Sequence, residues 1–176
     1  MLFILSNQFE RTMSYIPKYI LKRMFPKDKS LVLLSKSGGE ATHVRLTMVN
    51  VMSAMSVPDR IDLGGITPSD IAKGISIKIN GTEIPATEDL LTKGISLIHN
   101  GVEYNWDDVI NKNKAAGVTI AIGDKLALNI PLNDQMKQVL KPGPIEVNVT
   151  VNIGGTTNVV HTVDLPDEVK PWTLEL

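Results

Sequence analysis

The chain contains no cysteine among its 176 residues. Disulfide bonds, thiolate catalysis and cysteine-ligated zinc are therefore excluded. The three histidines, His43, His99 and His161, are far apart in the sequence and show neither HxH nor HExxH spacing. A zinc site would need distant strands to converge, so we expect no metal and no cofactor.

Motifs for nucleophilic and phosphate chemistry are also missing. No serine lies in a Gly-x-Ser-x-Gly elbow. The glycine pairs at 38–39, 64–65 and 154–155 are not followed by Lys-Ser or Lys-Thr and open no long helix, so they are not phosphate loops. These absences favour a protein that is not an enzyme.

Long apolar runs are absent as well. The opening residues Met1–Ser6 are apolar but too short for a signal sequence or a membrane span, and no other segment reaches spanning length. We therefore expect a cytoplasmic protein. Residues 1–13 are expected to be a disordered or upstream extension, with translation starting at Met1 or Met13, and residues 14–176 a single mainly β domain.

The net charge of −1 conceals an asymmetry along the chain. Residues 1–45 carry eight basic and three acidic side chains, whereas residues 46–176 carry ten and sixteen. Within residues 14–30 a helix is predicted, with Pro17 at its start and Pro26 at its end. Its apolar face suits docking on a sheet. The alternative is a basic amphipathic helix that lies on a membrane or on nucleic acid.

One motif occurs twice, twenty positions apart, within residues 67–106. The two copies are identical at eight positions, which are Thr67/Thr87, Lys73/Lys93, Gly74/Gly94, Ile75/Ile95, Ser76/Ser96, Asn80/Asn100, Gly81/Gly101 and Glu83/Glu103. Internal similarity at a fixed period indicates a repeated supersecondary unit. A third, more diverged copy is predicted at residues 117–124, where the residues match the repeat in type.

Each copy predicts a short helix followed by a hairpin. In the first copy, Thr67 suits an N-cap with Asp70 completing a capping box, and Gly74 is expected to end the helix in the left-handed conformation. Alternating isoleucines then flank Asn80-Gly81, the strongest short signal for a type I′ hairpin turn. The second copy repeats the pattern.

The remaining segments complete a mainly β fold. Apolar alternation and turn signals predict strands at 31–34, 42–55, 61–63 and 125–132, helical turns at 106–110 and 133–140, and a final hairpin of 145–153 and 159–165. Trp172 and Leu174 are expected to fold back onto the core. Residues 118–176 would supply C-terminal strands of an antiparallel β-sandwich or distorted barrel.

Comparison of the two copies locates a candidate site. Where the first copy has Ile79, Ile84 and Ala86, the second has bulkier or polar side chains and adds two carboxylates. The candidate binding residues are His99, Glu103, Tyr104, Trp106, Asp107 and Asp108. The two aromatic rings would offer a stacking surface and the other four side chains polar contacts. The alternative is that the second copy packs on a bulkier neighbour and its acids only begin a helix.

Two classes of function follow. The first is a non-enzymatic binding or assembly module that uses the aromatic-acidic hairpin or an exposed strand edge, as a homo-oligomer or with a protein partner. The second is a small β-fold enzyme or ligand carrier with a site around His99, Glu103, Asp107 and Asp108. Nucleic-acid binding through the basic N-terminal region is a third possibility, and it predicts steep salt dependence.

Overall fold

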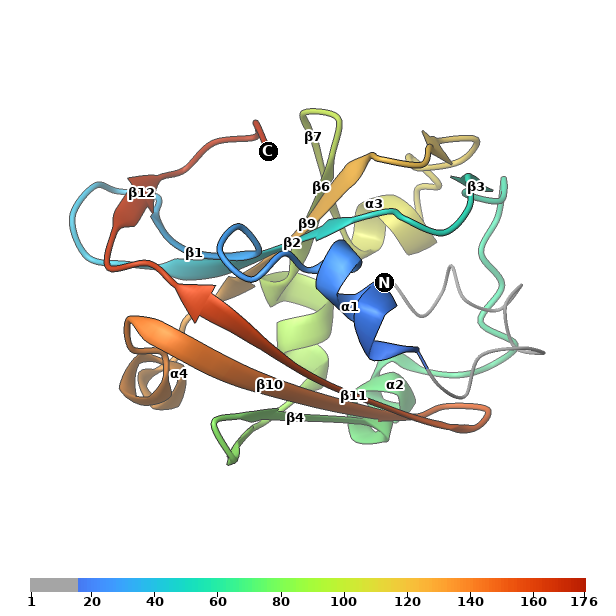
Figure 1. Ribbon diagram of the computed structural model, residues 1–176. Helices are drawn as coiled ribbons and strands as arrows, with labels where there is room; N and C mark the ends of the chain where they lie inside the picture. The colour runs from blue at the N-terminus through green and yellow to red at the C-terminus, as the bar shows by residue number, and fades with distance from the viewer. Residues whose placement is uncertain (1–15) are drawn as a thin grey trace.

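The computed structural model describes residues 16–176, so the expectations for residues 1–13 lie outside the described part of the chain. Figure 1 shows two layers of β-structure, one above the other, with short helices at the ends and sides of the space between them. The fold is mainly β with antiparallel sheets, consistent with a β-sandwich, which confirms the predicted class. No helix within residues 16–176 is long and apolar enough to cross a membrane.

The larger sheet has six strands in the order β12-β1-β2-β9-β6-β7. Their bounds are β1 Leu31–Ser35, β2 His43–Val49, β6 Ser96–His99, β7 Val102–Asn105, β9 Lys125–Pro131 and β12 Val169–Pro171. All neighbours are antiparallel except β1 and β12, which run parallel.

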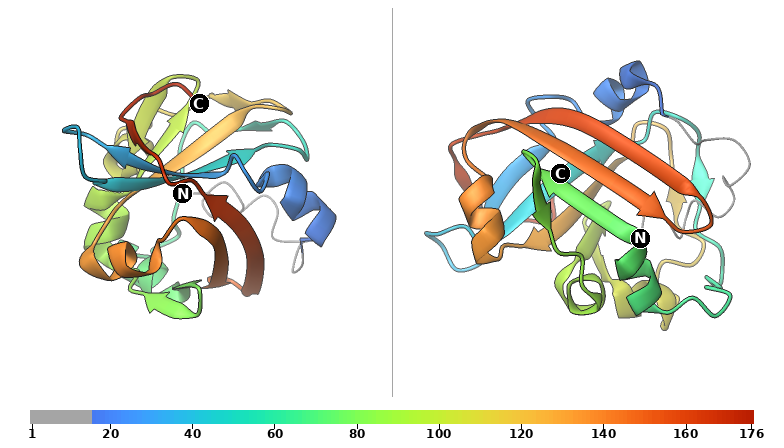
Figure 2. Two further views of the ribbon diagram at one scale, coloured as in Figure 1. Left: turned by 60° about the vertical axis from the view of Figure 1, so that its left-hand side comes forward. Right: turned by 90° about the horizontal axis from the view of Figure 1, so that it is seen from below.

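The second sheet has four antiparallel strands in the order β11-β10-β4-β5. Their bounds are β4 Ile75–Ile79, β5 Thr82–Ile84, β10 Gly143–Asn152 and β11 Thr156–Leu165. The long hairpin of β10 and β11 confirms the predicted C-terminal hairpin, and Figure 2 shows it from below. A two-stranded sheet pairs β3 (Met55–Ser56) with β8 (Thr119–Ile120).

Five short helices complete the fold of residues 16–176. They are α1 Lys18–Met24, α2 Pro68–Gly74, the π-helix η2 Leu90–Gly94, α3 Trp106–Ile110 and α4 Asp134–Val139. Helix α1 buries Leu21 and Met24, and Met24 packs in a cluster with Met48 of β2. The helix therefore docks by its apolar face, as predicted, while Tyr19 remains 66% exposed.

The two copies each contain a short helix and a hairpin, but the helix is an α-helix in the first and a π-helix in the second, and the hairpins lie in different layers. The first supplies β4 and β5 of the four-stranded sheet, and the second supplies β6 and β7 of the six-stranded sheet. Both hairpins turn as predicted, because Asn80 and Asn100 each have φ of 48° and the following glycines are also positive. The capping box of Thr67 and Asp70 is present.

The glycines that end the repeat helices act differently from the prediction. Neither Gly74 nor Gly94 is left-handed. Instead, a Cβ on Gly74 would lie 2.7 Å from Cγ1 of Ile153 and 3.0 Å from the carbonyl oxygen of Asn152. Gly94 is similarly close to Pro131. The repeat keeps these glycines because another strand approaches each helix end closely.

Three predicted elements are wrong. The strand predicted over 42–55 ends at Val49, because buried Asn50 turns the chain by donating to the carbonyl groups of Ser53, Ile120 and Ala121. Residues 61–63 form no strand. The proposed third copy contributes only Thr119–Ile120, which pairs with β3 and forms no hairpin of its own.

Candidate functional site

Tyr104 and Trp106 lie in the core, with exposed fractions of 8% and 6%. Tyr104 pairs across the hairpin with Leu97 on the inward face of the sheet, and Trp106 begins α3. Both pack in one cluster with Leu91 and Val109. These rings fill the space under the second copy, and neither forms the exposed stacking surface that the sequence predicts.

His99 is buried and bonded to a residue that sequence reasoning missed. Its Nε2 lies 3.0 Å from Oδ2 of Asp124, and the same oxygen accepts the backbone N–H of Ala121. The hydrogen bond with His99, followed by that from Ala121, lowers the pKa of Asp124. His99 also lines an otherwise apolar cavity of about 30 Å³ with Tyr104. A cavity of this size has room for about two water molecules.

Glu103 faces the other side of the sheet, where it accepts a hydrogen bond from Ser96 at 2.5 Å. The first repeat contains the equivalent pair, because the hydroxyl of Ser76 lies 3.5 Å from the carboxylate of Glu83. The Ser–Glu pair thus belongs to the repeated hairpin itself. This agrees with a structural role for Glu103.

A chain of polar side chains, buried at Arg45 and Asn129 and half-buried at Ser96 and Glu103, extends across four strands. Ser96 accepts from Nδ2 of Asn129 at 3.2 Å, and Oδ1 of Asn129 accepts from Nε of Arg45 at 2.7 Å. Arg45 is 3% exposed and Asn129 is fully buried. Burial lowers the pKa of Arg45, and the charge of Glu103 opposes this shift. We call Arg45, Asn129, Ser96 and Glu103 the polar chain.

Asp107 and Asp108 have local partners at the start of α3. Asp107 pairs with Lys112 at 2.6 Å, and Asp108 pairs with Lys114 at 2.5 Å. Asn105 and Asp108 also form a capping box. The helix start predicted here is confirmed, and both carboxylates lie in its first turn, where negative charge stabilises a helix.

The structure therefore separates the six candidate residues. Two lie in the core, His99 pairs with Asp124, Glu103 faces the opposite side of the sheet, and the two aspartates pair with lysines. Within residues 16–176 no group of three or more histidine, aspartate or glutamate side chains could hold a metal ion. At this hairpin an acid and a base meet only in the pair of His99 and Asp124, and the cavity beside His99 has room for about two water molecules.

Asp108→Asn is expected to remove part of the acid dependence of stability. The pKa of Asp108 is lowered first by Lys114 and then by the backbone N–H of Asn105, despite an opposing effect of burial. Asp108 therefore stabilises the fold above its unfolded pKa of about 4, and this contribution is lost as the pH falls through the lower folded value. Asparagine keeps an acceptor for the cap but has no charge.

The measurement is the melting temperature of both proteins from neutral to strongly acidic pH. The difference between them should be largest near neutrality and shrink in acid. Lys114→Gln is the matched control, because it removes the same ion pair by changing the lysine. Its difference in melting temperature from the wild type should shrink in acid in the same way. A difference that stays constant with pH would contradict the assignment.

A strand edge offers a larger open surface than the hairpin. The backbone N–H of Asp164 in β11 donates outward to the carbonyl of Lys27 at 2.6 Å. Because backbone groups alternate along an antiparallel strand, Asn158, Val160 and Thr162 also point their N–H and C=O groups away from β10. None of these outward groups has a backbone partner among residues 16–176. We call these three residues the free edge of β11.

The edge of β7 is shorter and partly closed. By the same alternation only Glu103 and Asn105 face outward there, and the N–H of Asn105 donates to Asp108 of the capping box. The free edge of β11 therefore presents three outward residues, against a single uncapped one on β7.

Comparison with known proteins assigns no family. No protein-family model and no curated protein sequence matches the chain. A weak match among solved structures is AggA, the major subunit of aggregative adherence fimbriae type I from Escherichia coli. It is 15% identical, the alignment covers 77% of this chain and 88% of that chain, and the TM-score is 0.17. At that score the likeness carries no argument about fold or function.

Proposed function

We propose that this chain is a non-enzymatic assembly module that self-associates by pairing the free edge of β11 with the same edge of a second copy. The observation that carries the proposal is the composition of this edge. Residues 156–163 read Thr-Thr-Asn-Val-Val-His-Thr-Val, without an acid, lysine, arginine or proline. Natural sheets protect their exposed edges with such residues, and this edge has none of them.

The edge is self-complementary about a twofold axis at Val160. Antiparallel pairing would place Val160 opposite Val160 of the second copy and Asn158 opposite Thr162 of the second copy. Each facing pair exchanges two backbone hydrogen bonds, so the contact would contain about six. Two four-stranded sheets would then join into one sheet of eight strands, which is a closed, isologous dimer.

Charge does not oppose this contact. Asp164, the acid that follows residues 156–163, has its carboxylate 3.7 Å from Nζ of Lys27. Its backbone N–H already donates to the carbonyl oxygen of Lys27. Val160 is 43% exposed, so pairing would also remove apolar surface from water. Valine and threonine favour the extended conformation that such pairing needs.

The other candidate functions have less support. A ligand site at His99, Glu103, Asp107 and Asp108 would need these side chains to converge, and the cavity beside His99 has room for only about two water molecules. Nucleic-acid binding would rest on the few cations of α1, among them the exposed Lys22 and Arg23. It stays a weaker proposal.

Val160→Pro tests the proposed function. The N–H of Val160 points away from β10, so proline removes no bond of the existing ladder but removes two from the proposed interface. At about 0.5–1.5 kcal/mol per hydrogen bond, self-association should weaken by roughly ten- to a hundredfold. Sedimentation or light scattering over a concentration series measures the monomer–dimer equilibrium.

Two lysine substitutions, one at the edge and one away from it, provide the control. Val160→Lys places two lysines opposite each other on the axis and should also yield monomer. Ser76→Lys adds the same charge to the same sheet face on β4, two strands from the edge, and should leave the dimer intact. A wild-type chain that is monomeric at every concentration, or a Val160→Pro variant that associates like wild type, would overturn the proposal.

A further inference from the structure

The last eleven residues cross from one sheet to the other. After Leu165 ends β11, residues 166–176, which we call the C-terminal strap, pass to the edge of the six-stranded sheet, where β12 pairs with β1 in parallel. The register places Val169 beside Leu33 and Pro171 beside Ser35. Figure 1 shows the strap continuing from β12 over the upper side of this sheet.

The strap is held by polar anchors from three places. The N–H of Trp172 donates to the carbonyl of Ser35 at 3.0 Å. Arg45 donates from Nη2 to the carbonyl of Thr173 at 2.6 Å, and Nζ of Lys125 lies 3.2 Å from the backbone oxygen of Leu176. Arg45 thus joins the strap to the polar chain.

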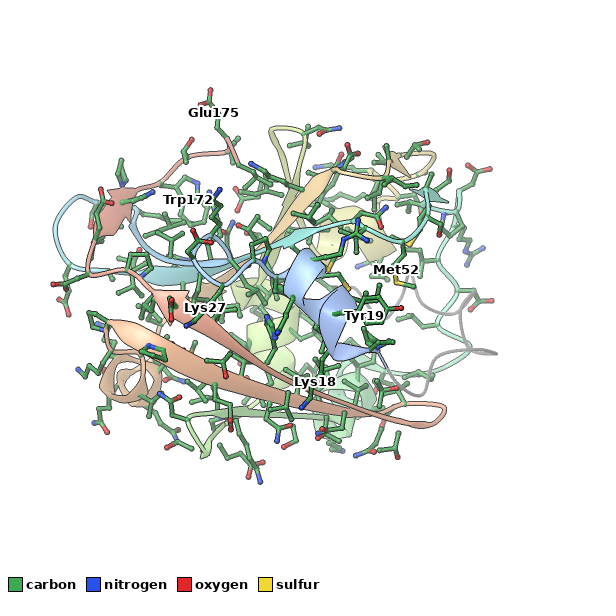
Figure 3. The ribbon with its side chains drawn as sticks, in the orientation of Figure 1. Lys18, Tyr19, Lys27, Met52, Trp172 and Glu175 are labelled. Carbon is green, nitrogen blue, oxygen red and sulfur yellow. The ribbon has the colours of Figure 1, made fainter. Side chains whose placement is uncertain are left out.

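The indole of Trp172 is the one large ring in the strap. Nζ of Lys36 lies 4.2 Å from its centroid, and the His43 ring meets it edge-on at 5.0 Å. Figure 3 shows Trp172 beside the sheet and Glu175 pointing outward. Trp172 therefore folds back against the sheet without joining the core, and Leu174 is 37% exposed, so the predicted packing of both residues onto the core is wrong.

The strap contributes little to the core that it crosses. All three residues of β12 are exposed, and no strap residue belongs to a core cluster. The sheet face that it crosses holds fully buried side chains, among them Ala127 and Asn129. Segments with few buried apolar contacts open at much lower free energy than the global fold, so the strap is the segment best suited to detach as a unit.

Charge favours docking of the strap in its groove, and the short hinge favours docking on another copy. The strap carries Asp167, Glu168 and Glu175 against a single lysine, whereas its groove carries Lys36, Arg45 and Lys125. Only residues 166–168 separate β11 from β12, and they begin with proline. A short, stiff hinge favours exchange of an identical element between protomers.

We propose that the C-terminal strap exchanges between copies of the chain, so that the strap of one copy occupies the β1 groove of another. The exchanged strap makes the same contacts with Ser35, Arg45 and Lys125 that it makes within one chain. This surface belongs to the six-stranded sheet and is independent of the free edge of β11, so exchange does not depend on the proposed function.

The absence of cysteine makes the test direct. Ser35→Cys and Pro171→Cys are prepared as separate full-length variants, each in the Val160→Pro background. Ser35 suits this change because its hydroxyl has no hydrogen-bond partner within the described residues, and Pro171 is its register partner. Neither variant can form this disulfide alone. After mixing and mild oxidation, a disulfide that links one variant to the other can form efficiently only when the strap of one copy docks on the second copy.

We expect this mixed dimer to increase with protein concentration and to exceed several-fold the yield from Asn152→Cys mixed with Pro171→Cys, which reports random collision at an exposed site. The double variant Ser35→Cys/Pro171→Cys should form the same disulfide, within one chain when dilute and increasingly between chains as the concentration rises, which verifies the register. The proposal is overturned by a mixed yield no higher than the collision control, or by a double variant that forms the disulfide neither within nor between chains. Circular dichroism establishes that each variant is folded.

Discussion

Asn129→Leu is expected to lower the free energy of unfolding by about 3–5 kcal/mol. Leucine has nearly the shape of asparagine, so packing changes little. The loss arises because Nε of Arg45 would be left in a buried site without its acceptor at 2.7 Å. Ser96 would lose its donor at the same time. Chemical denaturation monitored by tryptophan fluorescence measures the change.

The double variant Arg45→Met/Asn129→Leu shows whether this loss comes from the uncompensated charge. With the guanidinium removed, no buried charge remains to be satisfied, and the double variant should be more stable than Asn129→Leu alone. Arg45→Met also removes the strap anchor to Thr173, so the recovery will be incomplete. If the two single losses simply add, the polar chain does not act as a connected unit.

Trp106→Ala is expected to destabilise the fold by about 3–5 kcal/mol, the usual cost of truncating a buried indole. Tyr19→Ala is the matched control, because that ring is 66% exposed and its loss should fall within about 0.5 kcal/mol. Thermal and chemical unfolding of both variants give the comparison. A stable Trp106→Ala protein would contradict the core placement and restore the ring as a candidate contact for a ligand.

Sequence reasoning succeeded where the determining chemistry is local. The positive φ values of Asn80 and Asn100 follow from the Asn-Gly dipeptide itself, and the capping box of Thr67 needs only a residue three positions later. The alternating strands from residue 125 onward are likewise set by neighbouring side chains. Each of these features can be recognised within a window of a few residues.

The placement of the candidate site residues could not be predicted from the sequence, because it is set by distant strands. Sequence comparison singled out Trp106 as unusual, but whether an aromatic ring meets a ligand or a core depends on what packs against it. Arg45 and Asn129, which the sequence did not indicate, lie 84 residues apart and meet through strand pairing. One available signal was that both are polar positions in otherwise apolar strands, although such positions usually face water.

The two distant partners of Arg45 also constrain how the chain folds. Asn129 and Thr173 follow it by 84 and 128 residues. Closing such long loops costs entropy before any contact compensates for it, so folds of high contact order form slowly. During synthesis, β1 and β2 leave the ribosome long before β9 and the strap exist. The six-stranded sheet therefore stays incomplete until the second half of the chain has been made. During that interval the apolar surface and unpaired edges of its first strands are exposed, which favours aggregation.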